Sequence, residues 1–297
     1  MRRSFQAIWF GFSTFLLCSP LHADSIYVSD FIQNQILQFT SSGQSSVFAG
    51  ASSGLSFPYD MAFSSTGDLY VTVEGSSDLL KYDSQGHASV FASVPGYFFN
   101  GLAFDHNGNL YASVYGANII MKYDSQGNGS VFASTGMNNP QGLAFDQGGN
   151  LYVGNEGSNA ILKIDPAGNM STFASTPLPI GLAFDKAGNL YVANNVAYTV
   201  TEFNPNGNGS VFANLRSEPY YPNFLAFDST GNLYVVGSGG VLEYDPHGNM
   251  TVFAVAPAGS DFMSVAVQPI PEPSILNLLS LGAGAFLGGR RLYKRED

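Results

Sequence analysis

One strand motif occurs six times along this chain of 297 residues and constrains its fold more than any other feature. The motif reads Asn-Leu-Tyr-Val in its clearest copies, and its tyrosine recurs at intervals of 43, 41, 41, 39 and 43 residues. Each repeat holds four short runs rich in Val, Leu, Phe and Tyr, which are typical of strands. A period near forty with four strands per unit predicts an all-β fold, a six-bladed β-propeller of four-stranded antiparallel blades. The six tyrosines are Tyr27, Tyr70, Tyr111, Tyr152, Tyr191 and Tyr234.

The positions of the innermost strands predict how the ring closes. An apolar run with a central alanine precedes five of the six tyrosine motifs, but none precedes the first. The missing copy occurs after the last repeat, where Ala266 follows the equivalent Ala226 by 40 residues. We therefore expect this C-terminal strand to pair with the N-terminal blade, which would leave no long open sheet edge.

The connections between strands differ in how much their length varies. Turns from the first to the second strand of a blade read Asp-x-x-Gly-Asn, as in residues 105–109, with Asp accepting turn hydrogen bonds and Gly supplying a positive φ. The step from one blade to the next varies between 10 and 14 residues, measured from the outer-strand Phe to the next inner-strand Ala. In a four-stranded meander these steps emerge on the same face as the loops between the second and third strands. We call this the variable face.

Aromatic residues outside the repeat gather on the variable face together with carboxylate and amide side chains. Rigid rings beside hydrogen-bonding groups suit a sugar or peptide ligand, although some of these rings could instead pack between blades. The predicted ligand-binding residues are Phe57, Tyr59, Tyr97, Phe98, Phe99, Tyr115, Asn155, Glu156, Asn194, Asn195, Tyr198, Tyr220 and Tyr221.

The sequence offers little for catalysis, and we predict no catalytic residue. His87, His106 and His247 fall in turns of constant length on the opposite face, away from a ligand pocket. No Cys nucleophile, clustered His pair or glycine-rich phosphate loop is present in the repeats. We therefore predict no cofactor. The alternative is one divalent cation such as calcium over the centre of the ring, held by Glu74, Glu156 and Asn194.

Both ends of the chain read as targeting segments. Residues 1–23 have a charged start, a short apolar core and a small residue, Ala23, as in a cleavable secretory signal peptide. The single cysteine, Cys18, lies inside this segment, so we expect no disulfide after cleavage. At the other end, Pro271-Glu272-Pro273 precedes an apolar run at 275–289 and a cationic end with Arg290 and Arg291. That run is a marginal membrane span, shorter than the usual length of about 20 residues.

The charge of the central region limits the possible partners. Residues 24–271 contain 19 acidic and five basic side chains, a net charge of −14. Nucleic acid and anionic membrane surfaces are poor partners for such a chain. Because many of the aspartates lie in the repeated turns, we interpret most of this charge as structural.

At family level, units such as Gly-Leu-Ala-Phe-Asp-x-x-Gly-Asn-Leu-Tyr-Val resemble NHL repeats. The ring over residues 24–268 is similar to the six-bladed gluconolactonase-like and virginiamycin B lyase-like propellers. The lyase resemblance implies a histidine over the centre of the ring, which this sequence lacks. The lactonase resemblance implies a metal ion at the centre of the ring with acidic and Asn ligands, and this sequence offers at best part of that ligand set.

The C-terminal segment carries a separate resemblance. Residues 269–297 resemble the PEP-CTERM sorting tail of Gram-negative bacteria, which implies processing by an exosortase and transient anchoring in the inner membrane.

These observations lead to three expected regions and one expected function. The regions are a signal peptide at 1–23, a propeller at 24–268 and a sorting tail at 269–297, whose hydrophobic part we expect to form a short helix. We expect an exported, non-enzymatic module that binds a glycan or a surface protein at the cell surface or in the exopolysaccharide matrix, with signal peptidase and exosortase as partners during export. The alternative is a metal-dependent lactonase or related hydrolase.

Overall fold

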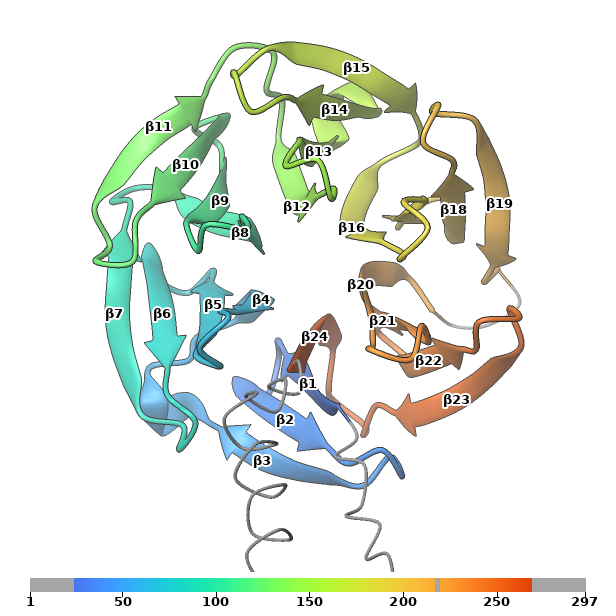
Figure 1. Cartoon of the computed structure of the whole chain (residues 1–297). Helices are drawn as coiled ribbons and strands as arrows, with labels where there is room; N and C mark the ends of the chain where they lie inside the picture. The colour runs from blue at the N-terminus through green and yellow to red at the C-terminus, as the bar shows by residue number, and fades with distance from the viewer. Residues whose placement is uncertain (1–23, 217–219, 269–297) are drawn as a thin grey trace, which may run out of the picture.

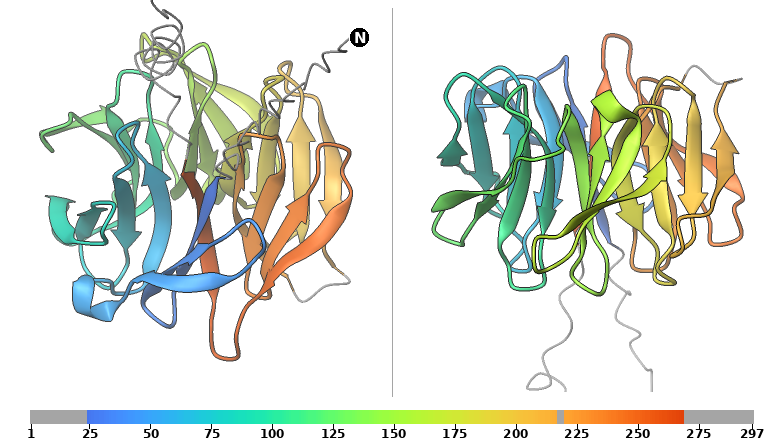
Figure 2. Two further views of the ribbon diagram at one scale, coloured as in Figure 1. Left: turned by 60° about the horizontal axis from the view of Figure 1, so that its bottom comes forward. Right: turned by 90° about the horizontal axis from the view of Figure 1, so that it is seen from above.

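The computed structural model describes residues 24–216 and 220–268, and this part of the chain forms a closed six-bladed β-propeller (Figure 1). Each blade is one four-stranded antiparallel sheet, and the strands run between two loop-bearing faces (Figure 2). The innermost strands surround the central axis, which we call the hub. The fold predicted from the repeat is confirmed.

The strands of each blade, from hub to rim, have the following bounds. Blade 1 comprises β24 (Phe262–Gln268), β1 (Ser25–Asp30), β2 (Gln35–Phe39) and β3 (Ser45–Ala49). Blade 2 comprises β4 (Pro58–Phe63), β5 (Leu69–Val73), β6 (Asp78–Tyr82) and β7 (Ala88–Ser93). Blade 3 comprises β8 (Phe98–Phe104), β9 (Leu110–Tyr115), β10 (Ile119–Tyr123) and β11 (Gly129–Ala133).

The second half of the ring repeats this order. Blade 4 comprises β12 (Pro140–Phe145), β13 (Leu151–Asn155), β14 (Ala160–Ile164) and β15 (Met170–Ser175). Blade 5 comprises β16 (Pro179–Phe184), β17 (Leu190–Asn194), β18 (Thr199–Phe203) and β19 (Gly209–Asn214). Blade 6 comprises β20 (Pro222–Phe227), β21 (Leu233–Gly237), β22 (Gly240–Tyr244) and β23 (Met250–Val255). Two short 3₁₀ turns, η1 (Ala51–Ser53) and η2 (Glu156–Ser158), lie in connections.

The C-terminal strand closes the ring as predicted. β24 pairs antiparallel with β1, and Ala266 lies opposite Tyr27. A bulge follows Val28, and beside it the backbone N–H of Ser264 donates to Ser29 Oγ at 2.9 Å. Blade 1 therefore joins the two ends of the described chain in one sheet.

The packing of the repeated tyrosine between neighbouring blades explains why the motif recurs along this chain. Tyr70 meets Phe91 of its own outermost strand and Phe104 of the next blade, with ring centroids 4.9 and 5.1 Å apart and edge-to-face orientations. The same three-ring contact recurs in five of the six interfaces, and each such pair is worth about 0.5–1.5 kcal/mol beyond its buried area. At the interface that the closing strand completes, Val267 replaces the second phenylalanine and packs in the cluster around Tyr234.

The constant-length turns are held by their aspartates, as the sequence predicts. Asp124 Oδ1 accepts backbone N–H bonds from Gln126 and Asn128, and the Asn128 amide donates to Asp124 Oδ2 at 2.8 Å. Gly127 has a φ of +85°, where a residue with a side chain would be strained. The side-chain amide of Asn128 and these backbone bonds lower the pKa of Asp124. Much of the negative charge of the ring therefore lies on aspartates that hold its turns through hydrogen bonds.

The predicted targeting segments lie outside the described residues. These are the signal peptide at 1–23, with Ala23, and the tail at 269–297, with Pro271, Glu272, Pro273, Arg290, Arg291 and the expected C-terminal helix. Among residues 24–216 and 220–268, no helix is long and apolar enough to span a membrane.

Replacing Phe262 by Ala tests the closure of the ring. Phe262 is buried on β24 in the cluster with Val28 and Phe39, and truncating a buried Phe costs about 3–5 kcal/mol. We expect the free energy of unfolding in a urea titration to fall by about that amount. Val255→Ala, at a side chain that is 72% exposed, serves as the control and should change it by less than about 0.5 kcal/mol. Equal, small effects of the two substitutions would contradict the closure.

Candidate functional site

The structure confirms that the two variable types of connection share one face. The backbone N–H of Glu74, after β5, donates to the carbonyl of Phe57 in the preceding connection between blades. The N–H of Val94 likewise donates to the carbonyl of Ser77. The loops after the second strands thus lie directly against the steps that enter each blade from its predecessor.

A bulge at the start of the innermost strand aims side chains into the hub. In blade 2, Pro58 pairs with Val73 and Met61 with Val71, so Tyr59 and Asp60 together oppose one residue, Thr72. Bulges of this type redirect side chains and interrupt the ladder of backbone hydrogen bonds. Similar register shifts occur at the innermost strands of blades 3 to 6.

Buried hydroxyl groups form hydrogen bonds with backbone N–H and C=O groups at these bulges and so join neighbouring blades. Thr72 Oγ1 accepts from the N–H of Asp60 at 2.8 Å and donates to the carbonyl of Asn100 in the next blade at 2.9 Å. Ser113 makes the same two contacts, with the N–H of Gly101 and the carbonyl of Gln141, both at 2.7 Å. Blades 4, 5 and 6 carry Gly, Ala and Val at this position, so this hydroxyl is confined to one half of the ring.

Gln141 connects polar side chains from three blades on the variable face. Its Oε1 accepts hydrogen bonds from the hydroxyl of Tyr59 at 3.2 Å and from the amide of Asn100 at 2.8 Å. Its Nε2 donates to Glu156 Oε2 at 2.6 Å. We call Tyr59, Asn100, Gln141 and Glu156 the hub cluster. It unites an inner-strand residue from each of blades 2, 3 and 4 with the first residue of η2.

The charge around the hub cluster keeps Tyr59 protonated. Burial raises the pKa of Tyr59, and the nearby negative charges of Glu74, Glu156 and Asp60 raise it further. Burial also raises the pKa of the carboxyl group of Glu74. Tyr115 lies close enough to contribute to the field at Tyr59 as well. The Tyr59 hydroxyl is thus a hydrogen-bond donor rather than a base.

Asn100 leaves an acceptor without a partner in the hub cluster. Its side chain is only 3% exposed, and its Oδ1 makes no hydrogen bond in the structure. Buried polar atoms are nearly always paired with protein, water or ligand. This oxygen therefore marks a place where a donor from water or from a bound molecule is needed.

Exposed aromatic rings adjoin the hub cluster at the boundary of blades 2 and 3. Tyr97, Phe98 and Tyr115 are each between 41% and 42% exposed. Phe98 pairs with Tyr115 across β8 and β9, and Tyr97 lies against Gly116, whose added Cβ would sit 3.6 Å from the Tyr97 ring. We call these three residues the aromatic patch. Tyr115 also lies close enough to Tyr59 to raise its pKa, so the patch lies beside the hub cluster.

A second aromatic pair lies at the boundary of blades 5 and 6. The rings of Tyr198 and Tyr221 are 4.7 Å apart, and the guanidinium of Arg216 lies 5.9 Å from the centre of the Tyr198 ring. Tyr198 has a φ of +58°, in the left-handed region that bulky residues rarely adopt. Nearby, the half-buried Asn195 donates from its amide to Asn223 Oδ1 at 2.7 Å.

Phe57 is a further exposed ring of the predicted set. It is 41% exposed, and its ring lies 5.1 Å from that of Phe31. Its position between blades 1 and 2 separates it in sequence and in the ring from both aromatic groups described above.

Four predicted ligand-binding residues are buried and serve the fold instead. The amide of Asn155 donates to the carbonyl of Gly136 at 3.0 Å, and its Oδ1 accepts from the N–H of Asn138 at 2.7 Å. The Phe99 ring is fully buried and lies 6.1 Å from that of Tyr123. We therefore remove Phe99, Asn155, Asn194 and Tyr220 from the candidate surface.

The alternative metal set does not fit the structure. Asn194 is fully buried, its Oδ1 accepts from Thr176 Oγ1 at 2.7 Å, and its amide donates to Thr201 at 2.8 Å, so its oxygen is not free to coordinate. Within residues 24–216 and 220–268, no three His, Cys, Asp or Glu side chains lie together as a metal site would require. Glu74 and Glu156 remain near Tyr59 as two carboxylates without that third ligand.

Asp60, Asn100 and Gln141 were missed from the sequence, although a signal was present. Asn100 and Gln141 each lie three residues before the inner-strand alanine of their blade, where blade 5 has the apolar Ile180. Comparing the repeats position by position would have found these polar interruptions in otherwise apolar strands.

Comparison with solved structures supports the fold. Virginiamycin B lyase from Staphylococcus aureus is 14% identical, with a TM-score of 0.62 over 80% of this chain and 86% of that one. A streptogramin B lyase structure is 13% identical, with a TM-score of 0.63 over 82% and 91%. A gluconolactonase from Xanthomonas campestris is 18% identical, with a TM-score of 0.62 over 72% and 83%. No family model matches the sequence, and no curated protein matches it. At these identities the likeness defines a shared six-bladed propeller fold.

The titration of Asp60 gives a testable pH dependence. Burial raises the pKa of Asp60 to about 7, and hydrogen bonds from Ser264, Leu102 and Met61 offset this only in part. The pKa of an Asp in the unfolded chain is about 4, so the folded state binds this proton more tightly. The associated stability is present at acid pH and is lost as the pH rises from about 4 to about 7. We expect the difference in unfolding free energy between wild type and Asp60→Asn to fall across that range in urea titrations.

The turn aspartate Asp124 provides the control for this measurement. Its pKa is lowered, so the stability that it contributes is lost only as the pH falls below about 4. The difference between wild type and Asp124→Asn should therefore stay constant from about pH 5 to 7. A constant difference for Asp60→Asn as well would contradict the raised pKa.

Proposed function

We propose that this protein is an exported, non-enzymatic β-propeller that binds a glycan on its variable face, where the aromatic patch meets the hub cluster. The single observation that carries the proposal is the closeness of these two groups, because Tyr115 belongs to the patch and lies close enough to Tyr59 to raise its pKa. Aromatic faces contact the C–H surfaces of sugar rings, while amides and carboxylates bind their hydroxyl groups.

The chemistry of the hub cluster supports binding more than catalysis. The Tyr59 hydroxyl and the Glu156 carboxylate are both already engaged by Gln141, and the raised pKa of Tyr59 removes it as a general base. His87, the nearest histidine to a carboxylate, is exposed and bonded to Asp83 in a turn on the opposite face. A lactonase or hydrolase activity lacks an observation in its favour.

The proposed location of the protein follows from the sequences of its two end segments. The signal peptide at 1–23 would direct export and be removed after Ala23 by signal peptidase. The PEP-CTERM-like tail at 269–297 would anchor the protein transiently in the inner membrane and present it to an exosortase. The mature propeller would then act at the cell surface or in the exopolysaccharide matrix of a Gram-negative bacterium.

A glycan array with the propeller, in the presence and absence of EDTA, tests the proposed function. We expect retention of at least one glycan class that is insensitive to EDTA. Tyr115→Ala should weaken it by about tenfold, which corresponds to about 1.4 kcal/mol, because a ring at a binding surface is lost. Binding that EDTA abolishes would favour the metal-dependent alternative.

Tyr221→Ala is the matched control for Tyr115→Ala. Tyr221 is an equally exposed tyrosine on the same face, at 46%, but it lies between blades 5 and 6. It should leave glycan binding unchanged. If only Tyr221→Ala weakened binding, or if the array were blank while a surface protein bound the aromatic patch, the glycan proposal would be wrong.

A further inference from the structure

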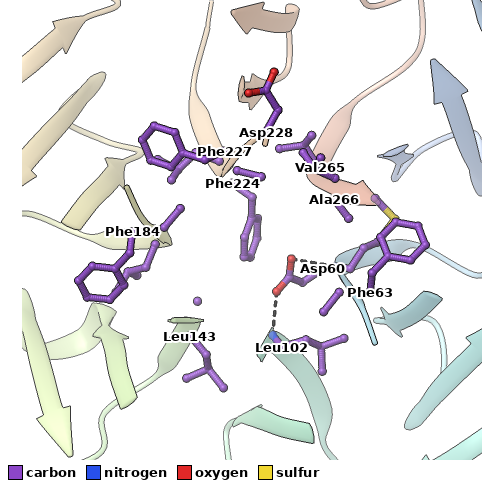
Figure 3. Close-up of a pocket in the computed structure, with 18 of the residues that line it drawn as sticks. Asp60, Phe63, Leu102, Leu143, Phe184, Phe224, Phe227, Asp228, Val265 and Ala266 are labelled. Carbon is purple, nitrogen blue, oxygen red and sulfur yellow. Dashed lines mark hydrogen bonds between the residues drawn. The ribbon is translucent and has the colours of Figure 1, made fainter. Parts of the chain in front are cut away.

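The hub contains a cavity of about 500 Å³ on the side away from the variable face. Figure 3 shows it along the axis of the ring, with the side chains of Asp60 and Phe224 pointing toward its centre. Its wall is mainly aliphatic and aromatic, and includes Leu102, Leu143, Leu182 and Val265. The cavity continues to Asp228 and Ser229, in the constant-length turn of blade 6. Its mouth therefore lies on the face opposite the hub cluster.

Two rings separate this cavity from the proposed glycan site. Tyr59 and Phe224 meet edge to face across the hub, with their centroids 5.6 Å apart. Tyr59 belongs to the hub cluster, whereas Phe224 lines the cavity. A molecule in the cavity and a glycan on the variable face would thus occupy different sites.

Asp60 is a buried carboxylate without a charged partner. It is 5% exposed, and its Oδ1 accepts from Ser264 Oγ at 2.7 Å and from its neighbour Met61 N–H at 2.8 Å. Its Oδ2 accepts a single bond, from the N–H of Leu102 at 2.8 Å. None of the ion pairs among the described residues includes Asp60. Buried carboxylates are usually paired with a cation, and one carboxylate offers about four acceptor positions, of which three are used here.

We propose that the hub cavity is a second ligand site, which takes a small organic ammonium ion with a compact apolar body. The ammonium group donates to Asp60 Oδ2, and the apolar body fills the space between Leu143, Leu182 and Phe224. The volume lies within the usual range for small-molecule sites, which combine apolar walls with a few polar groups. The raised pKa of Asp60 agrees with a carboxyl group that lacks a positive partner.

Other ligand classes fit the cavity less well. A divalent cation such as calcium needs six to eight oxygen ligands. The other carboxylate of the lining, Asp228, already accepts hydrogen bonds from Thr230 and Asn232 within its turn. An anion would be repelled by Asp60, and a neutral apolar molecule would leave that carboxylate unpaired.

Methyl NMR of the protein titrated with benzylammonium tests the proposal directly. At about pH 8 the Asp60 carboxyl group is ionised, and we expect shifts of the methyl signals of Leu102, Leu143 and Leu182 on binding. Benzyl alcohol and benzoate, which have the same ring, should bind at least tenfold more weakly. Asp60→Asn should weaken the binding of benzylammonium at least tenfold, while Asp78→Asn, a substitution outside the hub, should leave its affinity unchanged.

A second variant keeps the test valid if Asp60→Asn does not fold. Ala226 lines the cavity and is not a hydrogen-bond partner of Asp60, so Ala226→Leu should fill the space and block benzylammonium binding while Asp60 stays in place. Benzylammonium binding that matches benzyl alcohol, or that persists in Ala226→Leu, would overturn the proposal. Glycan retention should be unaffected by Ala226→Leu, so failure of this site and failure of the variable-face site are distinguishable.

Discussion

The structure depends on the pairing of β24 with β1. This contact joins residues about 240 positions apart in the sequence and turns a row of blades into a ring. Once the ring is closed, every blade has two neighbours, and the tyrosine of each second strand has a partner surface on the next blade. Val267 on β24 supplies that surface for Tyr234, so the interface between blades 6 and 1 exists only when β24 pairs with β1, a pairing that we call the clasp. Closure also covers the inner edge of β1, which would otherwise be exposed.

The buried hydroxyl groups of the hub follow from this geometry. Each inner strand begins with a bulge, and a bulge frees backbone groups that need partners. Ser29, Thr72 and Ser113 provide them and bond onward to the next blade. The same bulge turns Tyr59 toward the variable face and Asp60 toward the cavity, so two sites of different chemistry share one short segment.

The sequence predicted the architecture because the fold depends on periodic, local features. Tyr70, Phe91 and Ala62 recur at fixed offsets, and the offset of Ala266 revealed the clasp. The variable face was predicted from loop lengths for the same reason. The site was less predictable, because sequence position alone does not say whether a loop aromatic points outward, as Tyr97 does, or inward, as Phe99 does. Asp60 was missed because its role depends on a bulge and on contacts with blades 1 and 3.

Amide hydrogen exchange at the clasp tests the closed ring most directly. Tyr27 of β1 lies opposite Ala266 of β24, in the register that Tyr70 and Ala62 have in blade 2. Because backbone N–H groups alternate in direction along a strand, the amides of Tyr27 and Ala266 face each other, whereas those of Ile26 and Val28 face β2. If the ring is closed, the amides of Tyr27 and Ala266 should be as protected as those of the central strand β13, and exchange only when the whole propeller unfolds. Rapid exchange of Tyr27 and Ala266 beside a protected β13 would show that β24 is not part of blade 1 and would contradict the account.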